Sequence, residues 1–318
     1  MDERPRFCPS GHGVYAPEAD LCVDCGAPLV LDRRGEVIGD GWSIDRLIGL
    51  GGMRSSVWQA SRSEGDEVEV AAVKIAECDL EAPEARRLIH SAAMVEGLHH
   101  PNIVQVYSYG ETEDNEAFMV MEFLKGRTLL QLLEQRGSLS PGQAVHVVSE
   151  VLVALQAMHE AGIIHRDIKP ANIHLTSRGG SPWEVRLIDL GIAKATRERA
   201  PDRLDFARES PGSQGPIIGT PEYMAPEQVL GAALDGRADL YATGIVLYRL
   251  VTGELPFQGR DRADLYEQQL RKRPPPPRAP DGSSGLPVGV ATAVLTALAK
   301  QPIDRFQSAE SFRLALEE

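Results

Sequence analysis

The sequence predicts an α+β protein of two lobes, a small strand-rich lobe and then a larger helical lobe, preceded by a small cysteine-containing module. Between residues 41 and 124, short apolar runs alternate with turn residues, a pattern typical of strands. After Gly126 the apolar residues recur every three or four positions, which is typical of helices. Three of the four cysteines lie between Cys8 and Cys25. We therefore expect a module at 1–32, a linker at 33–41, and lobes at 42–124 and 125–318.

The composition is that of an ordinary globular protein. Of 318 residues, 42% are hydrophobic and 25% are charged. No apolar run reaches the roughly 20 residues of a membrane span, and the start "MDERPRF" lacks the layout of a secretory signal. We therefore expect a cytoplasmic protein without a membrane span. The formal net charge of −13 argues against general binding to a nucleic-acid backbone.

The N-terminal module offers four metal-ligating side chains, Cys8, His12, Cys22 and Cys25. A tight pair, a loop and a CxxC turn are the layout that closes a tetrahedral zinc site, in which a neutral imidazole can replace one thiolate. The module resembles a bacterial zinc ribbon, except that His12 stands where a second cysteine is usual. The alternatives are a disordered tail with incidental cysteines and a redox CxxC pair. Few apolar residues are present, so zinc would supply the folding free energy.

The small lobe is expected to contain five strands and one helix. Gly65 marks a hairpin tip between the second and third strands, and Cys78 follows the third strand as an expected buried small hydrophobe. Residues 82–98 lack alternation and are rich in helix formers, which predicts a helix. The expected strands span 42–50, 55–61, 67–77, 102–110 and 116–124.

The large lobe is expected to open on a long helix at 140–162. Ser140 is a candidate N-cap, Pro141 a first-turn residue and Gln143 the capping-box partner. The residues expected on its buried face are Val145, Val148, Leu152, Leu155 and His159. Further helices are expected at 239–253, 290–300 and 308–318. The proline run "RKRPPPPRAP" is compatible with an SH3-type ligand or a stiff linker, but helical segments resume after it, which favours an internal loop.

The stretch "HRDIKPAN" gathers residues suited to phosphate chemistry. Asp167 can accept a proton from a hydroxyl, and Asn172, five residues on, can ligate a divalent cation. Lys169 between them can neutralise charge on a moving phosphoryl group. Asp189 ends the apolar strand in "VRLIDLG" and offers a second metal ligand. Lys74 lies in the apolar strand "AAVKIA", where an ammonium needs an anion such as a nucleotide phosphate.

Together, "AAVK", "HRDIKPAN", "DLG" and "GTPEYMAPEQ" resemble the signature set of bacterial eukaryotic-type (Hanks-type) serine/threonine protein kinases. The resemblance runs from about Gly41 to the end of the chain. It implies a bilobal protein-kinase fold and transfer of the γ-phosphate of ATP, with Mg²⁺ or Mn²⁺, to serine and threonine hydroxyls of proteins in a signalling role.

The resemblance implies a role for each residue of the reaction centre. Asp167 would be the catalytic base, and Asn172 and Asp189 the magnesium ligands. Lys169 would contact the transferred phosphate, which is the serine/threonine pattern. Thr220 would orient Asp167 and shape the substrate site.

The resemblance also implies a nucleotide pocket. Lys74 would hold the first two phosphates of ATP and Ala72 would cover the adenine. Met121 would be the gatekeeper and His174 would stand at the floor of the pocket. The other implied lining residues are Gly49, Leu50, Gly51, Gly52, Val57, Glu122 and Leu124.

Three more residues are implied as scaffold. Glu227 should pair with Arg305, and Asp239 should brace the catalytic loop from below.

The sequence departs from the family pattern in three places. The glycine-rich loop lacks its third glycine, and Val57 stands one residue late, which implies an insertion at the loop tip. The helix position expected to hold a glutamate partner for Lys74 holds Ser91; Glu84 and Glu96 lie too far along or around the helix to substitute simply. The pocket floor, usually aliphatic, holds His174, which either stacks on the purine or faces elsewhere.

These departures leave alternatives to an active kinase. One is a pseudokinase, a nucleotide-binding signalling scaffold in which Ser91 has removed the activating ion pair. Another is a small-molecule phosphotransferase, which the long stretch from Asp189 to Glu227 disfavours. The intact base and metal ligands favour the active kinase, because loss of one electrostatic group lowers a rate more often than it abolishes it.

Regulation is expected in two places. Ser213 is a candidate for autophosphorylation in the segment before Thr220, with Arg166 as the partner of the phosphate and with Thr196 and Ser210 as alternative sites. The zinc ribbon is expected to be a docking or regulatory module. Its ligand is left open between a partner protein, the kinase lobes and nucleic acid, and the acidic net charge disfavours the last of these.

Overall fold

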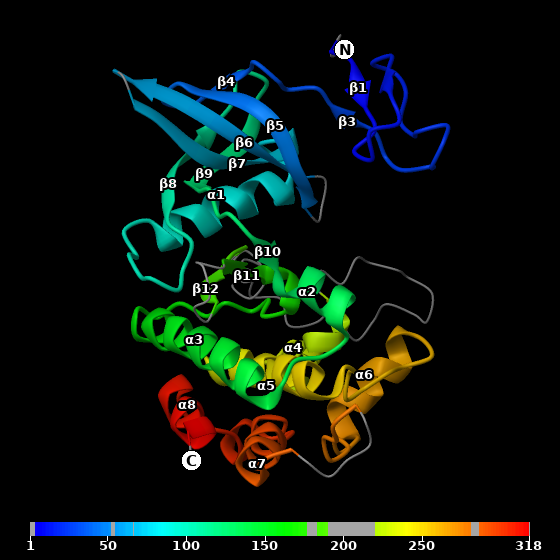
Figure 1. Cartoon of the computed structure of the whole chain (residues 1–318), viewed down its shortest axis with the longest axis vertical. Helices are drawn as coiled ribbons and strands as arrows, with labels where there is room; N and C mark the ends of the chain where they lie inside the picture. Colours follow the sequence, from blue (N-terminus) through cyan, green and yellow to red (C-terminus); the bar gives the residue numbers. More distant parts are fainter. Residues whose placement is uncertain are drawn as a thin grey trace. The chain divides into compact units, whose positions relative to one another are not determined.

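The computed structural model describes residues 4–51, 55–65, 67–176, 183–189, 220–280 and 286–317 (Figure 1). The chain forms two compact units. One comprises Met1–Leu98 with Gln105–Leu124, and the other comprises His99–Val104 with Lys125–Glu318. None of the helices in the described ranges is long and apolar enough to cross a membrane.

The first unit is built on a six-stranded antiparallel sheet in the order β4-β5-β6-β7-β9-β8. One helix, α1 (Pro83–Val95), packs on β7, β8 and β9 (Figure 1). All five expected strands and the expected helix are present. Gly65 has a φ of 64° at the hairpin tip, as a glycine at a tight turn allows. The strands span β4 Val37–Ile38, β5 Trp42–Gly51, β6 Ser55–Glu64, β7 Glu67–Asp79, β8 Val106–Glu111 and β9 Glu116–Glu122.

The two faces of this sheet differ in character. Trp58 on β6 lies opposite Val73 on β7, which lies opposite Val120 on β9, so the three side chains share one face. All three are fully buried in one apolar cluster. Lys74 directly follows Val73 along β7. Because successive side chains of a strand point to opposite faces of the sheet, the Lys74 side chain lies on the opposite face.

The N-terminal module covers the apolar face. Its small sheet has the order β2-β1-β3, formed by Val14–Tyr15, Arg6–Phe7 and Val30–Leu31. Val30 is buried in the same cluster as Trp58, and Phe7 packs against it, with the Phe7 and Trp58 rings 6.0 Å apart in an edge-to-face arrangement. The module therefore shares a core with the sheet.

The linker after the module is held by a buried arginine. The Arg33 side chain is fully buried and pairs with Glu116 on β9 and, at 3.1 Å, with Glu36. A buried arginine retains its charge, so it needs such carboxylates. This ion pair attaches the linker to the start of β9.

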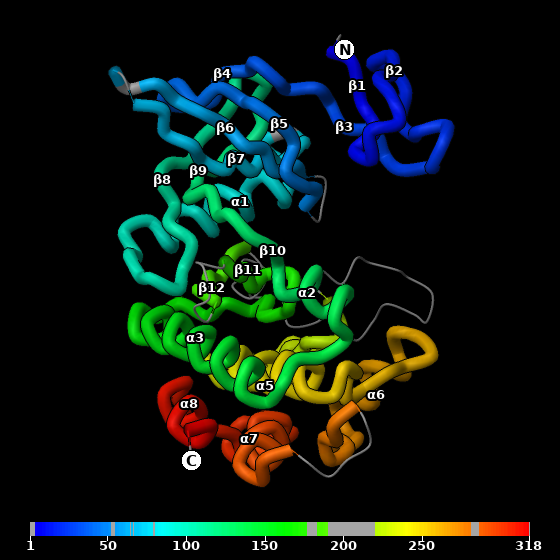
Figure 2. The backbone as a smooth tube through the Cα atoms, in the orientation of Figure 1, coloured from blue at the N-terminus to red at the C-terminus, as the bar shows by residue number. Residues whose placement is uncertain are grey.

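The second unit is mainly helical (Figure 2). Its central helix is α5 (Arg237–Thr252), which is buried along almost its whole length and packs on α3 (Pro141–Glu160) and α7 (Val288–Ala297). A small sheet has the order β10-β11-β12, formed by Arg127–Thr128, Ile173–Thr176 and Glu184–Leu187. The remaining elements are α2 Leu129–Arg136, η1 Pro170–Asn172, η3 Pro221–Tyr223, α4 Pro226–Val229, α6 Arg262–Arg271, η4 Pro302–Asp304 and α8 Ala309–Glu317.

The start of α3 confirms the expected capping box. The Ser140 hydroxyl accepts a hydrogen bond from the Gln143 N–H, and the Gln143 side chain accepts one from the Ser140 N–H at 3.3 Å. The buried face of α3 differs from the expected one. Val147 and Val151 are buried although they were not expected to be, and Val145 and His159, which were expected to be buried, are only half-buried. The helix contacts α5, α8 and β12, so it is buried on more than one side.

Two further expectations concern single segments. Cys78 is half-buried, so the expectation of a buried cysteine was wrong. The paired part of β6 ends opposite Ala76, which leaves the end of β7 uncovered on that side.

The proline run lies between α6 and α7 and forms no regular element at 272–280, which confirms an internal loop.

Candidate active site and metal centre

The loop at 165–172 is held from α5 by one buried carboxylate. Asp239 is 1% exposed and accepts hydrogen bonds from the backbone N–H of His165 at 2.9 Å and of Arg166 at 2.7 Å. His159 Nε2 lies 2.9 Å from the same carboxylate. Arg166 has a φ of 66°, a strained conformation for a non-glycine residue, and these bonds hold it there. The bracing role expected for Asp239 is confirmed, and His159 is a partner that the sequence did not indicate.

Four polar side chains meet at this loop. Lys169 Nζ donates hydrogen bonds to Asp167 Oδ2 at 2.9 Å and to Thr220 Oγ1 at 3.0 Å. Asn172 Nδ2 donates to the Asp167 carbonyl at 2.9 Å and to Asp167 Oδ2 at 3.1 Å. The cluster thus joins the loop to residue 220, which is 51 positions farther along the chain from Lys169. One carboxylate oriented by two donors and beside a cation is suited to accept a proton from a hydroxyl.

The donor set beside this carboxylate fits a magnesium ion. Asn172 is 4% exposed, and its Nδ2 is committed to Asp167 and, at 3.4 Å, to the Asp189 carbonyl. Its Oδ1 is therefore the atom that can ligate a cation. Asp189 follows β12 with a φ of 52° and contributes a half-buried carboxylate. An amide oxygen and a carboxylate oxygen are the hard ligands that Mg²⁺ or Mn²⁺ takes.

The second face of the large sheet presents the residues expected to meet the nucleotide. Val57 lies opposite Gly49 on β5 and opposite Lys74 on β7, and Ala72 lies opposite Met121 on β9. Residues directly opposite in an antiparallel sheet share a face, so these side chains lie on the face away from the module. Ala72 and Met121 are 6% and 8% exposed.

The pairing of β5 with β6 runs as far as Gly51 and Ser55. An added Cβ at Gly51 would come within 2.1 Å of the Ser55 hydroxyl, so a side chain at this position would have to displace that hydroxyl. Leu50 is half-exposed. Gly52 lies outside the described residues.

The end of β9 and the strand β11 carry the other expected pocket residues. The Glu122 N–H donates to the Gln105 carbonyl at 2.8 Å, and Leu124 follows half-buried. His174 on β11 is 9% exposed and lies against Gly126, where an added Cβ would come within 3.0 Å of His174 Cε1. Burial lowers the pKa of His174, and its buried Nδ1 has no hydrogen-bond partner among the described residues. The imidazole is therefore neutral at pH 7.

Ser91, at the position where the family pattern has a glutamate, lies on the buried side of α1. Ser91 is 9% exposed. Glu84 lies in the first turn of the helix, and Glu96, its C-cap residue, accepts a hydrogen bond from the Tyr109 hydroxyl at 3.1 Å. The residue that faces the sheet from the middle of α1 is thus an uncharged serine.

The expected scaffold pair is confirmed. Arg305 donates to both carboxylate oxygens of Glu227, at 2.7 and 2.8 Å, and both side chains are buried. Bidentate pairs of this kind fix geometry as well as charge.

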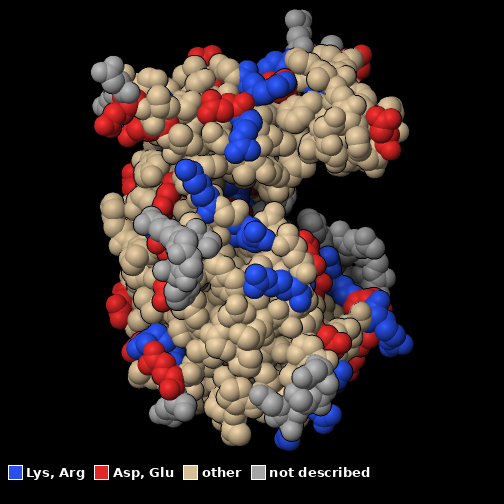
Figure 3. Space-filling view, in the orientation of Figure 1, with Lys and Arg blue, Asp and Glu red and all other residues tan. Residues whose placement is uncertain are grey.

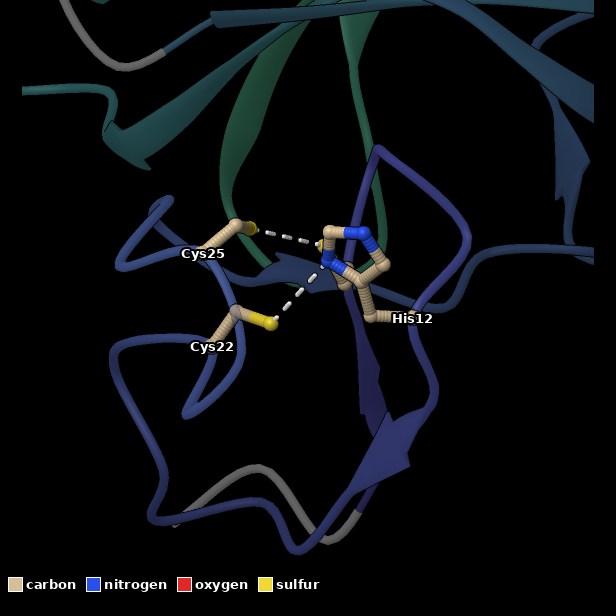
Figure 4. A group of neighbouring side chains, drawn as sticks. His12, Cys22 and Cys25 are labelled. Atoms are coloured by element: carbon tan, nitrogen blue, oxygen red, sulfur yellow. Dashed lines mark hydrogen bonds between the residues drawn. The ribbon is translucent and has the colours of Figure 1, made fainter.

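The four ligand candidates of the N-terminal module converge on one point. Figure 4 shows His12, Cys22 and Cys25 of this group. Their ligand atoms all lie within 4.8 Å of one another. His12 Nδ1 is 3.6 Å from the sulfurs of Cys8 and Cys22, and the sulfurs of Cys8 and Cys25 are also 3.6 Å apart. A tetrahedral zinc ion sets neighbouring S and N ligands about 3.5–3.8 Å apart. A disulfide would require about 2.05 Å between sulfurs.

The surroundings of Cys22 favour thiolate. Desolvation acts to raise the pKa of Cys22, but hydrogen bonds from the Tyr15 hydroxyl, from backbone N–H groups and from His12 outweigh it and lower the pKa to about 6. The Tyr15 hydroxyl lies 3.1 Å from Cys22 Sγ. Thiolate is the form that binds metal. Sequence reasoning missed Tyr15, because nothing in the spacing of the ligands points to it.

Comparison with known proteins assigns most of the chain to a family. The family model of the protein kinase domain matches residues 42–285. The chain belongs to the protein kinase family. This kinase chain is 38% identical over 287 residues to serine/threonine-protein kinase pkn3 of Myxococcus xanthus, with 89% of this chain and 50% of that protein covered. It is 39% identical over 311 residues to serine/threonine-protein kinase Pkn1 of the same organism, with 96% and 41% covered.

Solved structures agree with this assignment. A crystal structure of the Mycobacterium tuberculosis PknI kinase domain, a cysteine-to-alanine mutant, superposes with a TM-score of 0.65 at 26% identity. The superposition covers 90% of this chain and 98% of that one. The bilobal protein-kinase fold expected from the sequence is therefore confirmed, with a β-rich small lobe and a helical large lobe.

Proposed function

We propose that the chain is a serine/threonine protein kinase that transfers the γ-phosphate of ATP to hydroxyls of protein substrates. The observation that carries the proposal is the cluster of Asp167, Lys169, Asn172 and Thr220, joined by hydrogen bonds of 2.9 to 3.1 Å. The relatives described above are named serine/threonine-protein kinases. The chain spans about two-fifths to half of the length of these relatives, so the substrates of the whole protein stay open to experiment.

The chemistry follows from the contacts of Asp167. Its carboxylate accepts the proton of a serine or threonine hydroxyl while that oxygen bonds to the γ-phosphorus, and the bond from phosphorus to the β–γ bridging oxygen breaks to release ADP. Lys169, 2.9 Å from the carboxylate, neutralises charge on the group in transfer. Thr220 holds Lys169 from the other side.

The nucleotide contacts follow the assignment made from the family motifs. Lys74 binds the first two phosphates of ATP, and Ala72, Met121 and the backbone of Glu122 bind the adenine. Asn172 and Asp189 would hold Mg²⁺ or Mn²⁺, which would offset the negative charge of the phosphates. His174, neutral and shielded, provides a flat floor for the base.

The pseudokinase alternative receives no support from the relatives, which are named as kinases. Ser91 replaces one electrostatic partner, whereas the proton acceptor and both metal ligands are present. We therefore assign Ser91 an effect on rate.

We also propose that Cys8, His12, Cys22 and Cys25 hold one structural Zn²⁺. The 3.6 Å separations of their ligand atoms support this, and the module has little apolar core of its own beyond Cys8, Cys22 and Leu29. Metal analysis by mass spectrometry should find one zinc per chain. Cys22→Ser should lose the metal, whereas Cys78→Ser, which removes a cysteine outside the cluster, should retain it. A metal-free wild-type protein that is fully folded would contradict the proposal.

Three further expectations concern partners, location and regulation. A partner protein docking on the zinc module remains a prediction, as does a cytoplasmic location. On the face drawn in Figure 3, basic side chains lie in small groups with acidic side chains and uncharged surface between them, and we propose no nucleic-acid ligand. Ser213, Thr196 and Ser210, the candidates for autophosphorylation, lie outside the described residues.

The kinase proposal is tested by supplying Mg²⁺, γ-labelled ATP and a mixed protein substrate, followed by phosphoamino-acid analysis. Label on phosphoserine and phosphothreonine is expected. Label on phosphotyrosine alone would refute the serine/threonine assignment. Label on small molecules without label on protein would favour the small-molecule phosphotransferase.

A further inference from the structure

A buried glutamine of α6 ties together three elements of the second unit. Gln269 is 0% exposed. Its Nε2 donates a hydrogen bond to the backbone carbonyl of Glu222 in η3 at 2.9 Å, and its Oε1 accepts one from the Tyr241 hydroxyl of α5 at 2.6 Å. Both ends of the amide are therefore committed, and the orientation of the side chain is fixed.

The bonds form a chain that runs in one direction. Lys300 Nζ donates to the Tyr241 hydroxyl at 3.1 Å, Tyr241 donates to Gln269, and Gln269 donates to the Glu222 carbonyl. Lys300 Nζ also lies 3.9 Å from the centre of the Phe257 ring, which holds the ammonium in place. Hydrogen bonds in such a chain polarise and strengthen one another. The carbonyl at residue 222 is thus held by an extended and rigid network.

The segment at the end of this chain begins at the reaction centre. Thr220 caps η3 and lies 3.0 Å from Lys169, which lies 2.9 Å from Asp167. In a protein substrate the residues next to the phosphate acceptor lie one Cα–Cα step of about 3.8 Å away. A substrate chain whose hydroxyl is at Asp167 must therefore pass beside η3. A water molecule, by contrast, needs no contact with η3.

We propose that Gln269 is a positioning residue for the protein substrate: it fixes the backbone of η3 and through it the surface that receives the substrate residue next to the acceptor. The inference rests on the proposed kinase function. It predicts that loss of Gln269 weakens the use of protein substrates and spares the use of ATP. A merely structural role would lower both together.

The test compares three variants with wild type. Gln269→Met keeps the length of the side chain and removes both bonds, and Tyr241→Phe removes only the hydroxyl that orients the amide. Gln268→Met is the matched control, because Gln268 is the neighbour on the same helix and bonds to Gln258 and Asp264 instead of η3. The readouts are kcat and KM for a generic serine/threonine protein substrate, KM for ATP, and hydrolysis of ATP without protein.

Gln269→Met should raise KM for the protein substrate about five- to tenfold, as expected for one lost buried hydrogen bond, and leave KM for ATP and ATP hydrolysis within about twofold. Tyr241→Phe should shift KM in the same direction by less, and Gln268→Met should match wild type. Unchanged KM for protein in Gln269→Met, or ATP hydrolysis that falls in parallel, would overturn the proposal.

Hydrogen exchange separates this inference from the proposed activity. The backbone amides of Thr220, Glu222, Tyr223 and Met224 should exchange faster in Gln269→Met than in Gln268→Met, whether or not the wild type transfers phosphate. Equal exchange in the two variants would refute the positioning role. Absent transfer in wild type with faster exchange in Gln269→Met would refute only the kinase proposal.

Discussion

The guanidinium of Arg305 and the carboxylate of Glu227 form a buried bidentate ion pair across 78 positions of sequence, with N–O distances of 2.7 and 2.8 Å. The same guanidinium donates to the backbone carbonyls of Ala299, Lys300 and Arg237. All five of its N–H donors are therefore used. The ion pair joins α4, the helix that follows η3, to the residue directly after η4.

Breaking this pair should be costly. Glu227→Ala leaves the buried Arg305 charge without a carboxylate, and we expect the free energy of unfolding to fall by about 3–5 kcal/mol in urea titrations. Glu310→Ala, which removes an exposed partner of Arg313, is the control and should leave the free energy of unfolding close to that of wild type. Similar losses in the two variants would refute the structural role assigned to the buried pair.

The N-terminal module should stabilise the small lobe, although it lies outside the matched kinase region. Phe7→Ala removes a ring from the cluster around Trp58, and we expect a loss of about 1–3 kcal/mol in the free energy of unfolding. Val23→Ala changes a side chain that is 85% exposed in the same module and should be neutral. Intrinsic tryptophan fluorescence, to which Trp58 contributes, follows the transition. If Phe7→Ala unfolds at the wild-type denaturant concentration, the shared core is not energetically significant.

His174 should make stability depend on pH. Its pKa is lowered on folding by burial, so the unfolded chain binds the proton more readily, and stability falls as pH drops below about 6.5, the value for an unperturbed histidine. His174→Leu should reduce this fall between pH 7 and pH 5. It should also stabilise the protein by about 1 kcal/mol at pH 7, because the unpartnered Nδ1 is removed. Thermal unfolding at several pH values checks both effects; identical pH profiles would exclude His174 as their source.

The sequence identified the reaction centre well because its residues lie close together in the chain. Asp167, Lys169 and Asn172 fall on one loop, and the bonds among them follow from local geometry. Thr220 and Asp239 are distant in sequence, and only the resemblance to a kinase family placed them there. The capping box at Ser140 was also predictable, because it involves residues three positions apart.

Contacts between distant elements could not be predicted. Nothing in the pattern indicates that Phe7 and Val30 complete the core around Trp58, because each belongs to a two-residue strand with no periodicity. The half-burial of Cys78 follows from where the neighbouring strand stops, which is a property of pairing. Gln269 gave no signal either, since a glutamine in a polar helix usually faces water.

The most direct measurement of the central claim is phosphate transfer from γ-labelled ATP in wild type and in Asp167→Asn, which keeps the shape of the side chain and removes the proton acceptor. The account predicts labelled protein in wild type, a loss of about 10²-fold or more in Asp167→Asn, and unchanged nucleotide binding by thermal shift in both. Equal labelling in the two proteins would show that Asp167 is not the base. No labelling in wild type, with nucleotide still raising its melting temperature, would contradict the claim that this chain is an active kinase.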